Sequence, residues 1–104
     1  MDRQSTAIKK AAIFTLEKNE KFHLPQWIKY YSQFFEPEDI YILDHQSDEP
    51  ELRAYLDNLR KHGYNVREVG HHEIFNHDWL LSTVHTMQSE LLDNYEYVIY
   101  TDVD

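Results

Sequence analysis

The chain of 104 residues is long enough for one domain and too short for two. Hydrophobic residues make up 41% of it and charged residues 28%, values that are typical of a folded domain and argue against disorder. Nineteen acidic residues against ten basic ones give a net charge of −9, so the protein repels phosphate backbones and we expect no nucleic acid among its partners.

The composition also bears on the compartment. The sequence contains no cysteine, which excludes disulfides, thiolate zinc sites and a cysteine nucleophile. No apolar run approaches the roughly 20 residues of a transmembrane helix, and the polar segment 1–10 lacks the apolar stretch of a secretory signal. We therefore expect a cytoplasmic protein without a transmembrane segment, in which residues 1–10 form a flexible lead-in.

The first half of the chain contains two apolar runs and one amphipathic segment between them. The run 11–16 predicts a strand that is covered on both faces. After a polar loop, apolar residues fall at helical spacing from Leu24 onward, with Pro25 suited to the first helical turn and Pro37 ending the helix. The run 40–43 predicts a second strand.

The second half repeats this order. The sequence 48–51 resembles a capping box and predicts the start of a second helix, which Gly63 is well placed to end. Residues 66–69 predict a third, weaker strand. A third helix carries an apolar stripe that ends at Leu91, and a fourth strand follows over residues 97–101.

Strands and helices that alternate at intervals of about 30 residues are typical of strand–helix–strand units, whose crossovers are right-handed. Such units build a parallel sheet with helices on its faces. The sequence therefore predicts one α/β domain over residues 11–104, with a Rossmann-like three-layer α/β/α architecture and a mainly parallel four-stranded sheet.

Polar segments directly follow each of the predicted strands. In an open parallel sheet, ligands bind outside the carboxyl ends of the strands. The segments expected at this edge are 17–21, 44–48, 70–78 and 102–104. The functional site is therefore predicted there.

Asp102 and Asp104 follow the fourth predicted strand and flank Val103. In an extended chain their carboxylates point to the same side, where they repel each other unless a hard cation lies beside them. Such a pair binds Mg²⁺ or Mn²⁺ and leaves the other coordination positions to water and phosphate oxygens. The cation would also allow an acidic protein to hold an anionic diphosphate. The alternative is a solvated, frayed tail.

Two further residues of these loops are candidates for ligand contacts. Asp44 ends the second strand, where a carboxylate can accept a hydrogen bond from a nucleobase or a ribose hydroxyl, although a simple turn-forming role is equally compatible. Lys18 follows the first strand and could meet a phosphate, whereas a solvated lysine is the commoner outcome. Ser47 and Asp48 suit helix caps better than ligand contacts.

Two familiar classes of site are excluded. His72 and His77 resemble the histidine pair of a zinc protease, but they are five residues apart and would not share one helical face. Gly63 and Gly70 are the only glycines, so the chain has no Gly-rich phosphate-binding loop of the P-loop or dinucleotide-binding kind.

Four segments occur in a characteristic order: IFTLEKNE at 13–20, LPQWIKYY at 24–31, IYILD at 40–44 and YVIYTDVD at 97–104. Together they resemble the amino-terminal, nucleotide-sugar-binding half of a glycosyltransferase with the GT-A fold, in its family 2-like group, over residues 11–104. The resemblance implies a nucleotide-diphosphate sugar, such as a UDP-sugar, bound by these residues: Glu17, Lys18, Asn19, Glu20, Asp44 and Asp102. It also implies that Asp102 and Asp104 form the family's Asp-x-Asp motif, with Asp104 the more direct ligand of Mn²⁺ or Mg²⁺.

The resemblance further implies how far the activity extends. The metal would stabilise the departing diphosphate as a Lewis acid, without a protein nucleophile. The family's acceptor site and catalytic base follow the Asp-x-Asp motif, so no residue here is assigned as catalytic. We expect donor binding with little or no transfer, and an exposed sheet edge beside the fourth strand that would permit an edge-strand dimer.

Three other functions share features with this sequence. A phosphatase of the haloacid dehalogenase type also uses Asp-x-Asp, but on its first strand. A nucleotidyltransferase shares the parallel core but usually has a Gly-rich, basic loop where this chain has residues 17–20. Outside enzymes, the alternative is a small α/β binding or interaction module with an acidic tail.

Overall fold

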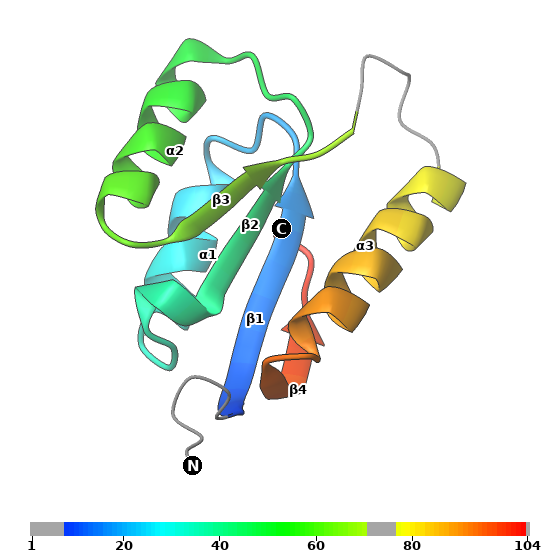
Figure 1. Ribbon diagram of the computed structural model, residues 1–104. Coiled ribbons are helices and arrows are strands. Elements are labelled where there is room, and N and C mark those ends of the chain that lie inside the picture. Colours follow the sequence, from blue (N-terminus) through cyan, green and yellow to red (C-terminus); the bar gives the residue numbers. More distant parts are fainter. Residues whose placement is uncertain (1–7, 71–76, 104) are drawn as a thin grey trace.

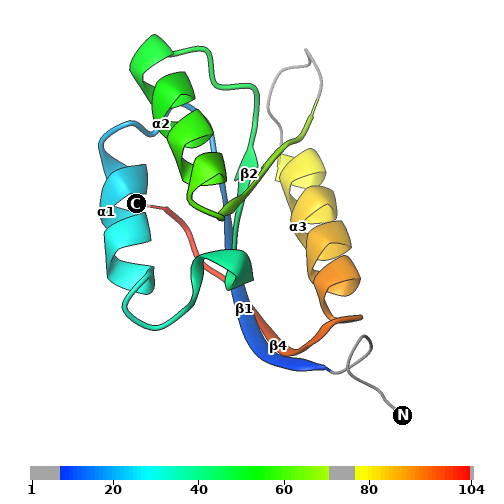
Figure 2. The same cartoon turned by 60° about the vertical axis from the view of Figure 1, so that its left-hand side comes forward.

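The computed structural model describes residues 8–70 and 77–103, which form a four-stranded sheet between helices (Figure 1). The strands are β1 (Lys9–Glu17), β2 (Ile40–Asp44), β3 (Asn65–Glu68) and β4 (Tyr95–Tyr100). The helices are α1 (His23–Tyr31), the short 3₁₀ helix η2 (Pro37–Asp39), α2 (Pro50–Lys61) and α3 (His77–Leu91). All neighbouring strands are parallel in the order β3-β2-β1-β4, with α1 and α2 on one face and α3 on the other (Figure 2). The predicted Rossmann-like α/β fold is thereby confirmed.

The alternation of side chains along β1 builds two cores, one on each face of the sheet. Ile13 packs toward α1 and α2, whereas its neighbour Phe14 packs toward α3. The core on the α1–α2 face consists of Ile13, Leu24, Trp27, Ile28, Ile40, Ile42, Leu52, Leu56 and Leu59. The core on the α3 face consists of Ala12, Phe14, Leu43, Met87, Leu91 and Tyr95. A strand buried on both faces explains the uninterrupted apolar run at its centre.

Three of the four strands begin slightly earlier than predicted, whereas β2 begins at the predicted Ile40. β3 and β4 start one and two residues before their predicted first residues, and β1 starts at Lys9, two residues before its apolar run. The lead-in predicted over residues 1–10 therefore extends too far. The N–H of Lys9 donates to the carbonyl of Asn94 at 2.9 Å, and its ammonium contacts the carboxylates of Glu38 and Asp39. The start of β1 is held by backbone pairing and ion pairs, so the pattern of apolar residues could not indicate it.

The first helix is shorter than predicted. α1 ends at Tyr31, although the apolar spacing continues to Phe35. The N–H groups of Phe34 and Phe35 both donate to the carbonyl of Tyr31, which closes a turn in place of a further helical turn. None of the helices within residues 8–70 and 77–103 has both the length and the apolar character needed to cross a bilayer.

The second helix begins and ends with the predicted chemistry, shifted by one residue at its start. Glu49, and not Asp48, is the N-cap, because its carboxylate accepts from the N–H of Leu52 at 3.0 Å. Pro50 occupies the first turn. Gly63, with φ of +93°, follows the helix and ends it as expected.

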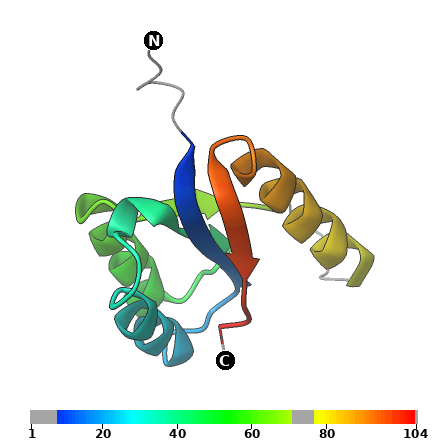
Figure 3. The ribbon, with the colours of Figure 1, turned by 90° about the horizontal axis from the view of Figure 1, so that it is seen from below.

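The strand order places a switch point between β1 and β4. The chain moves outward from β1 to β2 and β3, and then returns to add β4 on the other side of β1, where the two strands lie side by side (Figure 3). Ligands of open parallel sheets bind at the carboxyl end of such a switch point. β4 is an edge strand, and its Tyr97 and Ile99 side chains are 56% and 41% exposed.

Candidate functional site

The loops that follow β1, β2 and β4 meet at the carboxyl edge of the sheet, at the switch point. Between them lies a cavity of about 250 Å³, which we call the edge cavity. Its lining residues are Leu16, Glu17, Lys18, Glu20, His45, Leu80, Tyr100, Asp102 and Val103. The structure thus brings together four of the predicted site residues: Glu17, Lys18, Glu20 and Asp102.

Asn19, another predicted site residue, binds the loop after β2 instead of lining the cavity. Its φ of +55° lies in the left-handed region, which asparagine tolerates, and its N–H donates to Ser47 Oγ at 2.7 Å. Its side-chain carbonyl accepts from the N–H groups of Asp48 and Glu49 at 3.0 and 3.2 Å. Its amide donates to the Asp48 carboxylate at 3.2 Å. These hydrogen bonds join the loops after β1 and β2 into one unit.

Lys18 strengthens the same junction. Its ammonium donates to the carbonyls of His45 and Gln46 at 3.2 and 3.1 Å. Gln46 has a φ of +54°, which is uncommon for a residue other than glycine, asparagine or aspartate. The lysine therefore holds the carbonyls of a strained turn, and a phosphate at this position would compete with both of them.

Glu17 and Asp44 form a buried pair of carboxyl groups at the ends of β1 and β2. The two residues are register partners and are 2% and 0% exposed. Asp44 Oδ2 accepts from the N–H of Ser47 at 3.3 Å and from the guanidinium of Arg53 at 3.4 Å, whereas Oδ1 has no donor among the described residues when Glu17 is ionised. The pKa of Glu17 is raised to about 8, mainly by burial and secondly by a hydrogen bond with the Asp44 carboxyl. A protonated Glu17 can donate to the Asp44 carboxyl, which lowers the repulsion between the two groups.

The burial of Asp44 bears on its predicted role. In this conformation the side chain is fully enclosed and does not line the edge cavity. Contact with a nucleobase would require the turn at Ser47 to open. That role therefore stays a prediction, while the contacts of Asp44 in the structure are with the protein itself.

The segment after β4 presents Asp102 at the mouth of the cavity. Thr101 fixes this segment, because its hydroxyl accepts from the indole N–H of Trp27 at 2.8 Å. Val103 packs against the core on the α1–α2 face, so the chain turns toward α1 (Figure 2). Asp102 between them is exposed, and its Oδ1 accepts from the hydroxyl of Tyr100 at 3.2 Å.

The carboxylate oxygens around the cavity are of the type that a hard cation binds. There are fewer of them than such a cation usually needs. Asp102 and Glu20 supply carboxylate oxygens, which Mg²⁺ and Mn²⁺ prefer, and Glu20 Oε1 lies 2.9 Å from His23 Nδ1. Within the ranges 8–70 and 77–103, no three histidine, aspartate or glutamate side chains form a group that could hold a metal ion. Asp104, the predicted direct ligand, lies outside the described residues, so the metal pair stays a prediction.

His45 lies in the expected edge segment 44–48 but is not among the predicted ligand residues. Its ring stacks on that of Trp79, with centroids 4.3 Å apart and planes inclined by 32°. Gly70 passes close to both rings: a Cβ there would lie 2.6 Å from His45 Cδ2 and 2.9 Å from Trp79 Cζ2. The sequence could have indicated this position. His45 follows Asp44, so strand alternation directs its side chain to the α3 face.

The edge cavity combines an apolar wall with an acidic mouth. Leu16, Leu80 and Tyr100 provide the wall, and Glu20 and Asp102 provide the carboxylates. Such a lining suits a flat organic group held against the wall, with a cation or hydroxyl groups at the mouth. No protein-family model matches the chain, and no curated protein or solved structure matches it either.

Proposed function

We propose that the chain is the donor-binding domain of a glycosyltransferase, which binds a nucleotide-diphosphate sugar with Mn²⁺ or Mg²⁺ in the edge cavity. The observation that most supports this function is the convergence of the loops after β1, β2 and β4 on one cavity at the switch point of a parallel sheet. Nucleotides bind open α/β sheets at this position. We expect the domain to act in the cytoplasm.

A divalent cation is central to this proposal because of the charge of the chain. The protein has a net charge of −9, and the ammonium of Lys18 is already engaged with two backbone carbonyls. A diphosphate would therefore need a cation beside it. Asp102 and Asp104 would hold that cation, which would supply Lewis-acid stabilisation of the diphosphate leaving group.

The other residues around the cavity would position the ligand. Asn19 and Lys18 keep the loops after β1 and β2 in one arrangement, and the Glu17–Asp44 pair anchors those loops to the sheet. His45 and Tyr100 would flank the nucleotide from the α3 face. No residue of the chain is assigned as a nucleophile or a base, so we expect donor binding with little or no sugar transfer.

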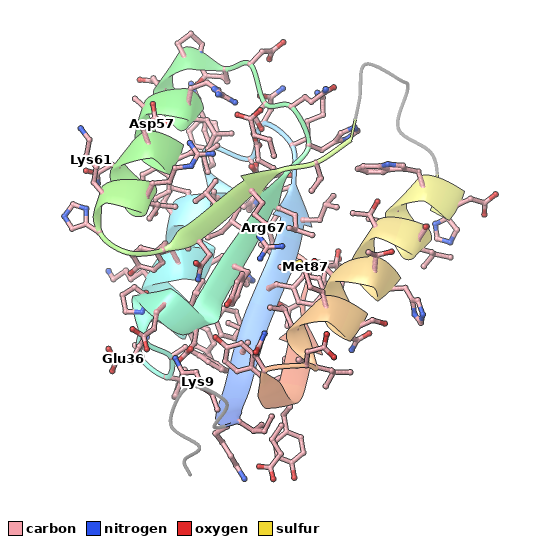
Figure 4. The ribbon with its side chains drawn as sticks, viewed as in Figure 1. Lys9, Glu36, Asp57, Lys61, Arg67 and Met87 are labelled. Carbon is pink, nitrogen blue, oxygen red and sulfur yellow. The ribbon has the colours of Figure 1, made fainter. Side chains whose placement is uncertain are left out.

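Thermal unfolding with nucleoside diphosphates tests the proposal. UDP and GDP are each added with Mn²⁺, and each component is also added alone. A ligand at about 100 times its dissociation constant stabilises the folded state by about 2.7 kcal/mol, and we expect this only when nucleotide and metal are both present. Asp102→Asn should abolish the shift. Glu36→Gln removes an exposed carboxylate at the opposite end of the sheet and should leave the shift unchanged (Figure 4).

Two results would count against the proposal. A nucleotide-induced shift that is equal in the wild type and in Asp102→Asn would place the nucleotide elsewhere. The absence of a shift with any nucleoside diphosphate would favour the non-catalytic binding or interaction module.

A further inference from the structure

A second cavity lies on the α3 face, between the helix and the β2–β3 half of the sheet. It has a volume of about 290 Å³, and we call it the α3 cleft. Its floor consists of the apolar side chains of Leu43, Val69 and Met87. Figure 4 shows Arg67, from β3, and Met87, from α3, pointing toward one another across this space. The guanidinium Nη1 of Arg67 lies 3.7 Å from Met87 Sδ.

On the helix side, hydroxyl side chains border the cleft. Thr83 is half-buried beside the apolar stripe with which α3 packs on the sheet, and Ser82 and Thr86 are exposed at the rim. An apolar strand surface normally recruits apolar helix residues, and a cavity left between them costs stability. Hydroxyl groups stand here where apolar side chains would pack better against the apolar floor. Such departures from good packing are typical of binding sites.

The charges at the rim of the cleft cancel. Arg67 Nη1 donates to Glu90 Oε2 at 2.7 Å, so the cation of the cleft already has a carboxylate partner. The pair carries no net charge, so the rim favours neither an anionic nor a cationic ligand. The rim therefore suits a neutral ligand, to which the pair can donate and accept hydrogen bonds at the same time.

We propose that the α3 cleft binds a neutral, hydroxyl-rich ring: a single pyranose sugar or a cyclic polyol of similar size. The apolar floor and the Trp79 side chain pack against the C–H face of the ring, while the hydroxyl side chains of α3 and the Arg67–Glu90 pair bond its hydroxyl groups. A cavity of about 290 Å³ lies at the small end of ligand sites and accommodates one ring. This site shares no lining residue with the edge cavity, and the proposal does not rest on the proposed function.

Saturation-transfer NMR on the full chain tests the proposal. The probes are D-glucose, D-galactose, N-acetyl-D-glucosamine and myo-inositol, with cyclohexanol and acetate as an apolar ring and an anion for comparison. We expect millimolar binding of at least one hydroxyl-rich ring and weaker binding of both comparison compounds. The proposal is overturned if none of the hydroxyl-rich rings binds, or if cyclohexanol or acetate binds as well as they do.

Variants locate the bound ring. Thr83→Val removes one hydroxyl at constant shape, and Arg67→Met removes the donor at the rim; each should weaken binding by about fivefold or more. Ser82→Trp fills the cleft and should abolish binding. Arg60→Met is the matched control, because Arg60 is an exposed arginine with one carboxylate partner, Asp57, on α2.

The outcomes for the two cavities are distinguishable. Ring binding that is unaffected by Thr83→Val and Arg67→Met, in variants whose circular dichroism and melting temperature match the wild type, overturns the proposal. Ring binding that persists in Asp102→Asn places the ring outside the edge cavity. Ring binding by a wild-type protein that shows no shift with any nucleoside diphosphate removes the proposed function and supports the α3 cleft.

Discussion

The two faces of the sheet are covered in different ways. On the α1–α2 face, the helices close over an apolar core, with the buried polar side chains of Thr15, Glu17 and Asp44 toward the carboxyl edge. Asn19 and Lys18 join the adjoining loops. On the α3 face, the helix packs on β1, β4 and Leu43 of β2, and the α3 cleft lies between the helix and the β3 side of the sheet. The closed face fixes the geometry of the loops at the carboxyl edge, and its cavity of about 300 Å³ lies between the starts of α1 and α2. The α3 cleft, by contrast, reaches Leu43 on the sheet itself.

The largest effect is expected at the buried Glu17–Asp44 pair. Because the pKa of Glu17 is raised to about 8 in the folded state, the folded protein holds a proton that the unfolded chain releases above pH 4.5. The contribution of Glu17 to stability is therefore fully present below pH 4.5 and is lost as the pH rises to 8, by about 4 kcal/mol. Urea denaturation across this range measures it.

Glu17→Gln isolates this contribution. Its neutral amide can still donate to Asp44, so the variant should match the wild type near pH 4.5 and exceed it in stability near pH 8. Glu36→Gln, at an exposed position, should follow the wild-type pH dependence. Parallel curves for the wild type and Glu17→Gln would show that Glu17 is ionised in the folded protein.

The next effect compares the two cores. Leu56, on the closed face, is 1% exposed, and Leu56→Ala should cost about 3–4 kcal/mol because its neighbours cannot fill the space. Met87 borders the α3 cleft, where space and solvent are already adjacent, so Met87→Ala should cost about 2 kcal/mol. Urea denaturation gives both values. A larger loss for Met87→Ala would mean that the α3 face is as tightly packed as the other.

A smaller effect is expected at the loop junction. Asn19→Ala removes three side-chain hydrogen bonds and disfavours the φ of +55°, and should cost about 2 kcal/mol. Asn19→Gly removes the same bonds but accepts this φ, so it should cost about 1 kcal/mol. If the two variants are equally stable in urea denaturation, backbone conformation contributes nothing to the junction.

The smallest effect on stability concerns the β4 edge. The predicted edge-strand dimer would bury Ile99, so Ile99→Lys should shift the protein to the monomer while changing its unfolding free energy by less than about 0.5 kcal/mol. Light scattering on a size-exclusion column measures the mass over a concentration series. A wild-type protein that stays monomeric at every concentration contradicts the dimer.

Most of the fold could be predicted from the sequence because the patterns that indicate strands, helix starts and helix ends are local. The doubly buried run 11–16, the Pro25 helix start and the Gly63 stop each depend on neighbouring residues, and the structure confirms the elements that they predict. Local patterns failed at ends that tertiary contacts decide. Lys9 joins β1 through Asn94, far along the chain, and the turn at Tyr31 stops α1 where the apolar spacing still continues.

The site was predictable in position but not in detail. The carboxyl edge follows from the parallel sheet alone. Which loops are neighbours there depends on the strand order, which puts β4 beside β1. The sequence gives no sign that Asn19 would bind the loop after β2 or that Asp44 would be enclosed, because both result from the register of β1 and β2. The metal and nucleotide roles stay predictions.

The stacked rings of His45 and Trp79 have a consequence for both cavities. His45 lines the edge cavity and Trp79 lines the α3 cleft, so the pair forms a partition between them, with no room for a side chain at Gly70. A ligand that displaces one ring must disturb the other. By thermodynamic reciprocity, occupants of the two cavities would then alter each other's affinity by one common factor, whichever binds first.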